Sequence, residues 1–149
     1  MAAEYSRIDL QTVDVDDNII FNNGNRACRK GFISHRDDSG IFFLKGTTNC
    51  CKAIYKVHFD GNIAIATGGT VEPISVAITI NGEPLGNATA IATPAAVGVP
   101  DTLANFFNVS LTTFIVVPCD CCVTVSVENT SDGTAIYVRN ANIIIDRVA

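Results

Sequence analysis

Alternation of apolar and polar residues is the main pattern along this chain. In the stretch IYKVHFDG, residues 54–61, every second residue from Tyr55 to Phe59 is apolar, and polar or charged residues stand between them. Residues 74–80 and 123–127 repeat the same period of two. Because successive side chains of a β-strand point to opposite faces, this period predicts strands with one buried face and one exposed face.

Other apolar stretches are separated by turn-forming residues, and we expect them to be strands as well. They are NIIF, GIFFLKG, NFFNVSLTTFIVV, AIYVRN and ANIIIDRVA, with clusters of Gly, Asn, Asp, Ser and Pro between them. Only residues 101–106, after Pro100, have the start of a helix, and they predict one turn at most. Many short strands without helical crossovers predict an all-β fold, an antiparallel β-sandwich.

Length and composition indicate one domain that associates with copies of itself. The chain has 149 residues, which is within the size range of a single hydrophobic core. We divide it into an extended N-terminal arm, residues 1–20, and a sandwich domain, residues 21–149. With 48% hydrophobic and only 17% charged residues, the chain is apolar for a soluble monomer, which predicts an oligomer.

Charge and hydropathy argue against two classes of partner. The 15 acidic residues outnumber the 10 basic ones, and no Lys/Arg run is present to neutralise phosphates, so we expect no nucleic-acid partner. No apolar run approaches the roughly 18 residues of a membrane-spanning helix. The opening MAAEYSRIDLQTVDVDDN has neither the basic leader nor the apolar centre of a secretory signal. We therefore expect a chain that is made in the cytoplasm and has no membrane partner.

The order of four motifs resembles the C1q/TNF-like jelly roll. The motifs are IYKVHFDGNIAI, ISVAITINGEPLGNATAI, VTVSVEN and a terminal ANIIIDRVA, all within residues 50–149. The chain is similar in particular to the C-terminal domain of the collagen-like glycoprotein on bacterial spore surfaces, although it carries no collagen-like Gly-x-y stretch. Through its opening EYSRIDLQTV it also resembles small structural proteins of phages that infect gut Firmicutes.

The resemblance implies a jelly-roll sandwich that forms tight homotrimers, with one sheet of each subunit facing the threefold axis. It also implies that the strands containing IYKVHF and SLTTFIVV are antiparallel neighbours. The start of the first strand and the end of the second would then lie at the same end of the sandwich. This end would hold a cluster of five cysteines, namely Cys50, Cys51, Cys119, Cys121 and Cys122.

The cysteine cluster has three interpretations. Cys119 and Cys122 have the spacing of zinc ligands, but the adjacent Cys50 and Cys51 are an awkward second pair. A thioredoxin-like redox centre needs its CxxC at a helix N-terminus, whereas a strand follows here. Disulfides or buried thiols need no ligand geometry, so we favour a bond between the early pair and one of the three later cysteines. We expect no bound metal, and Cys28 stays free or pairs across subunits.

The sequence gives little support to catalysis. Ser34, His58 and Asp60 are the residue types of a hydrolase triad, but no nucleophile elbow or oxyanion-forming glycine motif accompanies them. His35 is the only other histidine, and we expect structural roles for both. The acidic residues 14–18 offer oxygen ligands for calcium but lack the glycine and distal glutamate of a closed loop, so we expect a solvated arm. We expect no enzyme, no catalytic residue and no cofactor.

Three functional hypotheses remain. In the first, which we favour, the trimer is a structural protein on the surface of a phage virion. It decorates the capsid or forms a head fibre, and its N-terminal arm docks on the major capsid protein or another lattice protein. In the second, the chain is a spore-surface protein of the exosporium type. In the third, the trimer is a receptor- or glycan-binding head that uses apical loops within residues 87–101.

Overall fold

The structure, a computed structural model, describes residues 2–26, 31–46 and 52–149. Every regular element in these ranges is a β-strand, and the same ranges hold no helix that would reach across a bilayer. The strands are β1 (Ala2–Arg7), β2 (Gln11–Val13), β3 (Asn23–Arg26), β4 (Ile33–His35), β5 (Phe42–Lys45), β6 (Lys52–Ile65), β7 (Ile74–Ile80), β8 (Glu83–Ala92), β9 (Phe107–Pro118), β10 (Cys122–Asn129) and β11 (Ile136–Arg147).

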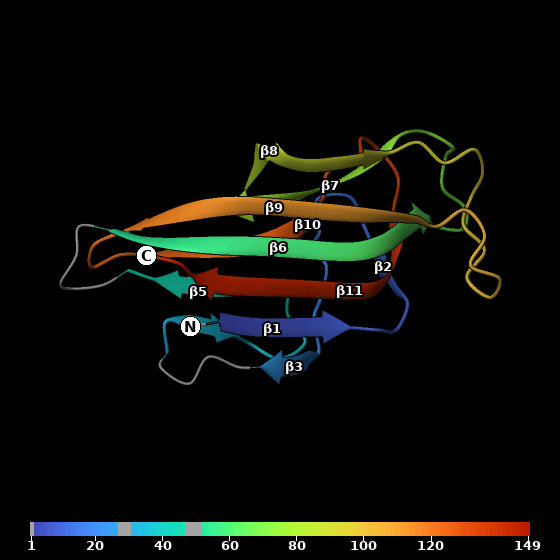
Figure 1. Ribbon diagram of the computed structural model, residues 1–149. Helices are drawn as coiled ribbons and strands as arrows, with labels where there is room; N and C mark the ends of the chain where they lie inside the picture. Colours follow the sequence, from blue (N-terminus) through green and yellow to red (C-terminus); the bar gives the residue numbers. More distant parts are fainter. Residues whose placement is uncertain (1, 27–30, 47–51) are drawn as a thin grey trace.

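The strands form two antiparallel sheets that pack face to face, one behind the other in Figure 1. The six-stranded sheet has the order β3-β1-β11-β6-β9, and β2 adds to it by pairing with β11. The five-stranded sheet has the order β4-β5-β10-β7-β8. This architecture confirms the predicted antiparallel β-sandwich.

The hydrophobic core lies between the two sheets and takes alternate residues from each strand. On β6, Tyr55, Val57 and Phe59 have no exposed surface, as their period of two predicts. Phe21 packs edge-on against Phe42 and Phe59, with ring-centroid distances of 5.5 and 6.3 Å. Each large apolar side chain buried in this way stabilises the fold by roughly 1.5–3 kcal/mol.

Strand β9 pairs antiparallel with β6 along the whole length of β9. Their register runs from the pair Lys52–Pro118 at one end to the pair Ile63–Phe107 at the other. This confirms the predicted pairing of the strands that contain IYKVHF and SLTTFIVV. Since β11 pairs with the other side of β6, β6 is an inner strand, and the residues on its outer face have neighbours on both sides.

The N-terminal segment belongs to the sandwich, which corrects the expected boundary between an arm, residues 1–20, and a domain that begins at residue 21. β1 lies between β3 and β11 in the six-stranded sheet (Figure 1). Tyr5 is only 6% exposed, and its ring centroid lies 5.2 Å from that of Phe42. Ile19 is fully buried, and its N–H donates to the Val127 carbonyl at 2.8 Å. β1 pairs with the edge of β11 opposite β6, and the side chain of Tyr5 is part of the hydrophobic core.

The segment expected to start a helix, residues 101–106, forms an irregular turn instead. The Val99 N–H donates to the Ala104 carbonyl at 3.1 Å, which closes the turn. Leu103 and Asn105 have φ angles of 62° and 65°, in the left-handed region. Residues in this region do not continue a right-handed helix, so the helical prediction here is wrong.

Candidate functional site

The candidate site is the outer face of β6, β9 and β11 in the six-stranded sheet, which we call the sheet face. The residues that point to the core are buried on all three strands, and their sequence neighbours point outward. The register aligns the outward residues in cross-strand rows. Two central rows are Thr112–His58–Ile144 and Phe114–Lys56–Asp146, each written in the strand order β9, β6, β11.

Apolar side chains gather at one end of the sheet face, and we call them the apolar stripe: Ile54, Phe114, Val116 and Val148. Phe114, Val116 and Val148 are 62%, 51% and 47% exposed. Val116 pairs with Ile54 across β9 and β6, and the Val148 N–H donates to the Ile54 carbonyl at 2.9 Å. These residues therefore form one continuous patch, and contiguous apolar patches mark interaction surfaces.

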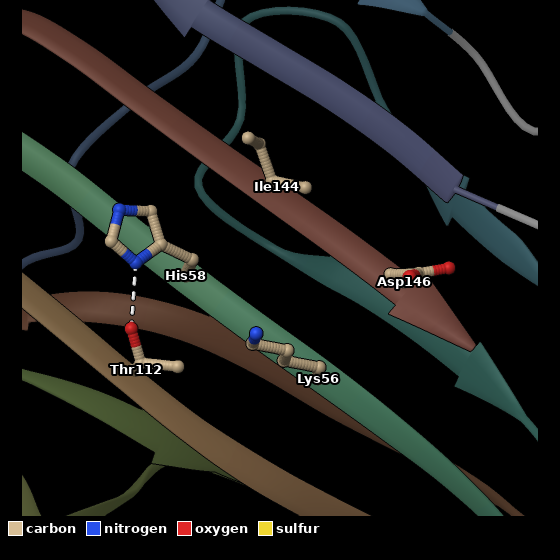
Figure 2. Close-up of a pocket in the computed structure, with 5 residues that line it drawn as sticks. All are labelled: Lys56, His58, Thr112, Ile144 and Asp146. Atoms are coloured by element: carbon tan, nitrogen blue, oxygen red, sulfur yellow. Dashed lines mark hydrogen bonds between the residues drawn. The ribbon is translucent and has the colours of Figure 1, made fainter. Parts of the chain in front are cut away.

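A pocket of about 270 Å³ lies beside the apolar stripe on the same face. Figure 2 shows that its lining comes from three neighbouring strands. The lining residues are Lys56 and His58 of β6, Thr112 of β9, and Ile144 and Asp146 of β11. The lining combines one apolar side chain, Ile144, with hydrogen-bonding and charged groups, so the pocket can make both apolar and polar contacts with an occupant.

His58 is held in position across the sheet. Its Nδ1 lies 2.6 Å from Thr112 Oγ1, and its Nε2 lies 3.6 Å from Asp60 Oδ2 (Figure 2 shows the contact with Thr112). The threonine hydroxyl can donate to or accept from the ring, depending on the tautomer. The imidazole is thereby fixed as one wall of the pocket.

The structure does not assemble the hydrolase triad considered above. His58 and Asp60 lie on β6 of the six-stranded sheet, whereas Ser34 lies on β4, an edge strand of the other sheet. His35, next to Ser34, stacks on Phe42 at a centroid distance of 4.4 Å, and its Nε2 lies 2.8 Å from the Ser39 carbonyl oxygen. His35 is therefore a packing residue of the core edge.

The three later cysteines lie in and beside the turn that joins β9 to β10. Cys121 and Cys122 are exposed and carry free thiols. Cys119 follows Pro118, the residue that pairs with Lys52 at the start of β6. Cys28, Cys50 and Cys51 lie outside the described residues, so the disulfide between the early and late cysteines stays a prediction. In the described ranges, no three His, Cys, Asp or Glu side chains come together as a metal site.

The backbone of the acidic segment around residue 16 packs against β10, so the segment is not an arm, which corrects that part of the expectation. The side chains of Asp14, Asp16 and Asp17 are exposed, as expected of a solvated segment. The Asp16 N–H donates to the Asn129 carbonyl at 2.9 Å. Partial burial raises the pKa of Glu128 on β10, and the nearby carboxylates of Asp16 and Glu83 raise it further. The mutual repulsion of these carboxylates is an electrostatic cost of the fold.

The alternation in residues 54–61 predicts that His58 lies on the exposed face of its strand, but the sequence identifies neither the pocket nor the apolar stripe. Phe114 stands in the apolar run FIVV, residues 114–117, where no alternation shows which side chains face out. The signal that resolves this run is the polar alternation just before it. Every second residue just before this run is exposed, namely Asn108, Ser110 and Thr112. Phe114 continues this alternation, so its side chain also points outward.

Comparisons with known proteins identify the fold. No protein-family model matches this chain, and no curated protein matches its sequence. Two solved structures are similar over almost the whole chain. The structure of Eiger TNF from S. frugiperda superposes with a TM-score of 0.67 at 11% identity, covering 100% of this chain and 92% of that one. The globular domain of zebrafish complement 1qA protein superposes with a TM-score of 0.55 at 9% identity, covering 99% and 97%.

Proposed function

Because the chain has a C1q/TNF-like jelly-roll fold, we propose that it is a non-enzymatic structural protein that works as a homotrimer. In this trimer the sheet face of each copy is turned toward the threefold axis. The observation that carries the proposal is the apolar stripe, which leaves Phe114, Val116 and Val148 about half exposed or more in the single chain. Burying these side chains between copies gains roughly 25 cal/mol per Å² of apolar surface.

The polar groups of the sheet face also suit burial in a self-association interface. Asn108 Nδ2 donates to Asn62 Oδ1 at 3.2 Å, and Asn62 Nδ2 donates to Asn140 Oδ1 at 3.2 Å. His58 and Thr112 pair with each other. Polar groups that already have partners lose less free energy when water is removed than unpaired groups do.

We assign the trimer to the surface of a phage virion, as a capsid decoration or head-fibre protein. The resemblance of the sequence to small phage structural proteins supports this role. The partner is then the major capsid protein or another lattice protein, and three identical contacts per trimer multiply weak binding into high avidity. Since β1 is part of the sheet, docking takes place through the folded trimer and not through a free arm.

A second candidate function is recognition of a receptor or glycan by loops at the end of the sandwich where β9 begins. Leu103 is 59% exposed and has a positive φ angle, which is unusual for a residue with a bulky side chain. Arg139 steadies its loop, because Arg139 Nη1 donates to the Pro100 carbonyl at 2.9 Å. Strained backbone held in place in this way is found preferentially at functional sites.

Two experiments test the proposed function. Light scattering of the purified chain should report a particle of three 15.8 kDa chains, and a single 15.8 kDa species would contradict the trimer. Electron microscopy with an antibody against the chain should label virions. Label on spores would instead support the spore-surface alternative. For the second candidate, binding to a glycan array that is lost in Leu103→Ser would favour recognition.

A further inference from the structure

Phe114 is an aromatic side chain without cover on the edge strand of the six-stranded sheet. β9 is the last strand in the order β3-β1-β11-β6-β9, and Phe114 points away from the core. It is 62% exposed, the largest exposed fraction in the apolar stripe. Exposing an aromatic ring to this degree costs free energy that a partner surface can recover.

The pocket beside Phe114 is not filled by this chain's own phenylalanine. Its lining consists of Lys56, His58, Thr112, Ile144 and Asp146, and Phe114 is not part of it. Its volume of about 270 Å³ exceeds the roughly 150 Å³ of a cavity that holds benzene. The pocket is therefore large enough for a phenylalanine ring from another molecule.

The ring and the pocket lie at the same height along the strands. Phe114 shares its cross-strand row with Lys56 and Asp146, and both of these line the pocket. We place the threefold axis of the proposed homotrimer along the strands of the sheet face. A rotation about this axis moves a side chain sideways but leaves its height unchanged. Phe114 of one copy therefore faces the cross-strand row of the next copy that includes Lys56 and Asp146, two residues that line its pocket.

We infer that Phe114 of each copy inserts into the sheet-face pocket of the neighbouring copy around the threefold axis. The inference rests on the proposed homotrimer and names the contact that holds it together. The contact is heterologous, because the ring of one copy meets the pocket of the next, and such contacts close into a ring when the rotation closes. The site is complete only when a second copy of the chain supplies the ring.

The chemistry of the pocket suits an aromatic occupant. The Ile144 side chain and the aliphatic stem of Lys56 offer apolar contacts, and the Lys56 ammonium can lie against the ring face. His58, fixed by its contact with Thr112, offers a second flat surface for stacking. A buried, well-packed aromatic anchor of this kind dominates the energy of many protein interfaces.

The short distance between ring and pocket also locates the axis. Adjacent strands lie about 4.8 Å apart, so Phe114 and the pocket centre are separated by roughly 5–8 Å. A threefold rotation moves a point by about 1.7 times its distance from the axis, which puts the axis about 3–5 Å from both. The three Phe114 rings therefore gather around the axis, in the middle of the interface, where binding energy concentrates.

Two substitutions remove the contact from opposite sides. Phe114→Ser removes the ring, and Ile144→Trp fills the pocket from within. Each should weaken trimerisation by at least about tenfold for each of the three contacts, as measured by light scattering over a dilution series. The matched control is Ile91→Ser, which removes an exposed isoleucine from β8 of the other sheet and should leave the trimer intact. Thermal unfolding by circular dichroism shows that each variant is folded.

Mixing the two variants tests the insertion itself. The Ile144→Trp chain keeps its ring and the Phe114→Ser chain keeps its open pocket, so a mixed trimer regains one of the three contacts. An equimolar mixture should therefore associate about tenfold more tightly than either variant alone. Native mass spectrometry of the mixture, with one chain carrying a tag, detects the mixed trimers over a dilution series. A mixture that associates no more tightly than the separate variants would overturn the insertion, because it would mean that Phe114 packs elsewhere.

The outcomes also separate this inference from the proposed function. A wild-type chain that is monomeric would overturn both. A wild-type trimer that survives Phe114→Ser at all concentrations would overturn the insertion and leave the trimer standing. A trimer that Ile91→Ser dissociates as strongly as Phe114→Ser would likewise overturn the assignment to the sheet face.

Discussion

Asn129 on β10 donates its side-chain amide to the carbonyl of Val13 on β2, at 3.0 Å, and has no exposed surface. The same amide donates to the Thr134 carbonyl at 3.1 Å, and Asn129 Oδ1 accepts the Ser131 N–H at 3.0 Å. One buried side chain therefore ties the N-terminal segment, the end of β10 and the turn before β11 together. Such a network leaves several orphaned polar groups if its centre is removed.

We predict that Asn129→Ala destabilises the fold by about 3 kcal/mol or more, since it leaves backbone groups buried without partners. Chemical denaturation followed by circular dichroism measures the free energy of unfolding. The control is Asn108→Ala, which removes an exposed asparagine from the sheet face and should cost about 1 kcal/mol or less. Equal losses in the two variants would contradict the structural role of Asn129.

Deletion of residues 1–7 should unfold the chain or lower its thermal midpoint strongly. β1 lies between β3 and β11, so its loss exposes the edge of β11 and removes Tyr5 from the core. The milder Tyr5→Ala should cost about 3–5 kcal/mol. Differential scanning calorimetry checks both. A truncated chain with an unchanged midpoint would show that residues 1–7 are an arm after all.

The carboxyl group of Glu128 should make stability depend on pH. Burial, with repulsion from Asp16 and Glu83, raises its pKa in the folded chain above the ordinary value of 4.5. Between the ordinary and the raised pKa, the folded chain binds more protons than the unfolded chain, so the contribution of Glu128 to stability falls as pH rises through this window.

We therefore predict that Glu128→Gln raises the thermal midpoint at pH values above this window and has little effect below the ordinary glutamate pKa. Thermal scans from pH 4 to pH 8 measure the difference from the wild type. Asp132→Asn is a suitable control, because Asp132 is exposed. A benefit of Glu128→Gln that is the same at every pH would show that its charge is not the cause.

The disulfide prediction can be narrowed by the structure. Pro118 pairs with Lys52, and Cys51 and Cys119 are the sequence neighbours of this pair, so Cys119 is the partner that we expect for Cys50 or Cys51. Peptide mapping by mass spectrometry under non-reducing conditions identifies the bond. Cys119→Ser should then cost about 2–4 kcal/mol in oxidised protein, whereas Cys121→Ser should not. A linkage through Cys121 or Cys122 would contradict this pairing.

Part of the candidate site could be predicted from the sequence. The alternation in residues 54–61 showed that His58 and Lys56 point away from the core, because the side chains of a strand change face at every residue. The alternation said nothing about which strands lie on either side. Thr112 and Ile144 are 54 and 86 positions away from His58 along the chain, and they meet it only because β9 and β11 flank β6.

The sequence pattern does not predict five of the described strands, β1 to β4 and β8, and for β1 and β8 the reason can be identified. β1 contains only one large apolar residue, Tyr5, so its sequence shows no clear period of two and predicts an arm instead of a strand. β8, Glu83–Ala92, contains a proline, a glycine, an asparagine and three alanines, which are depleted in strands, so its sequence pattern does not predict a strand. Both strands exist because their backbone groups pair with a neighbouring strand.

The sequence by itself determined the fold class and the inner and outer faces of the long strands, because a period of two is a local property that side-chain geometry imposes. Only the tertiary structure decided the strand order, the place of β1 in the six-stranded sheet, and the position of the pocket beside the apolar stripe that includes Phe114. These depend on register between distant segments, which hydrogen bonding and core packing select together. A one-residue slip of β9 would bury Phe114 and expose its core-facing neighbours.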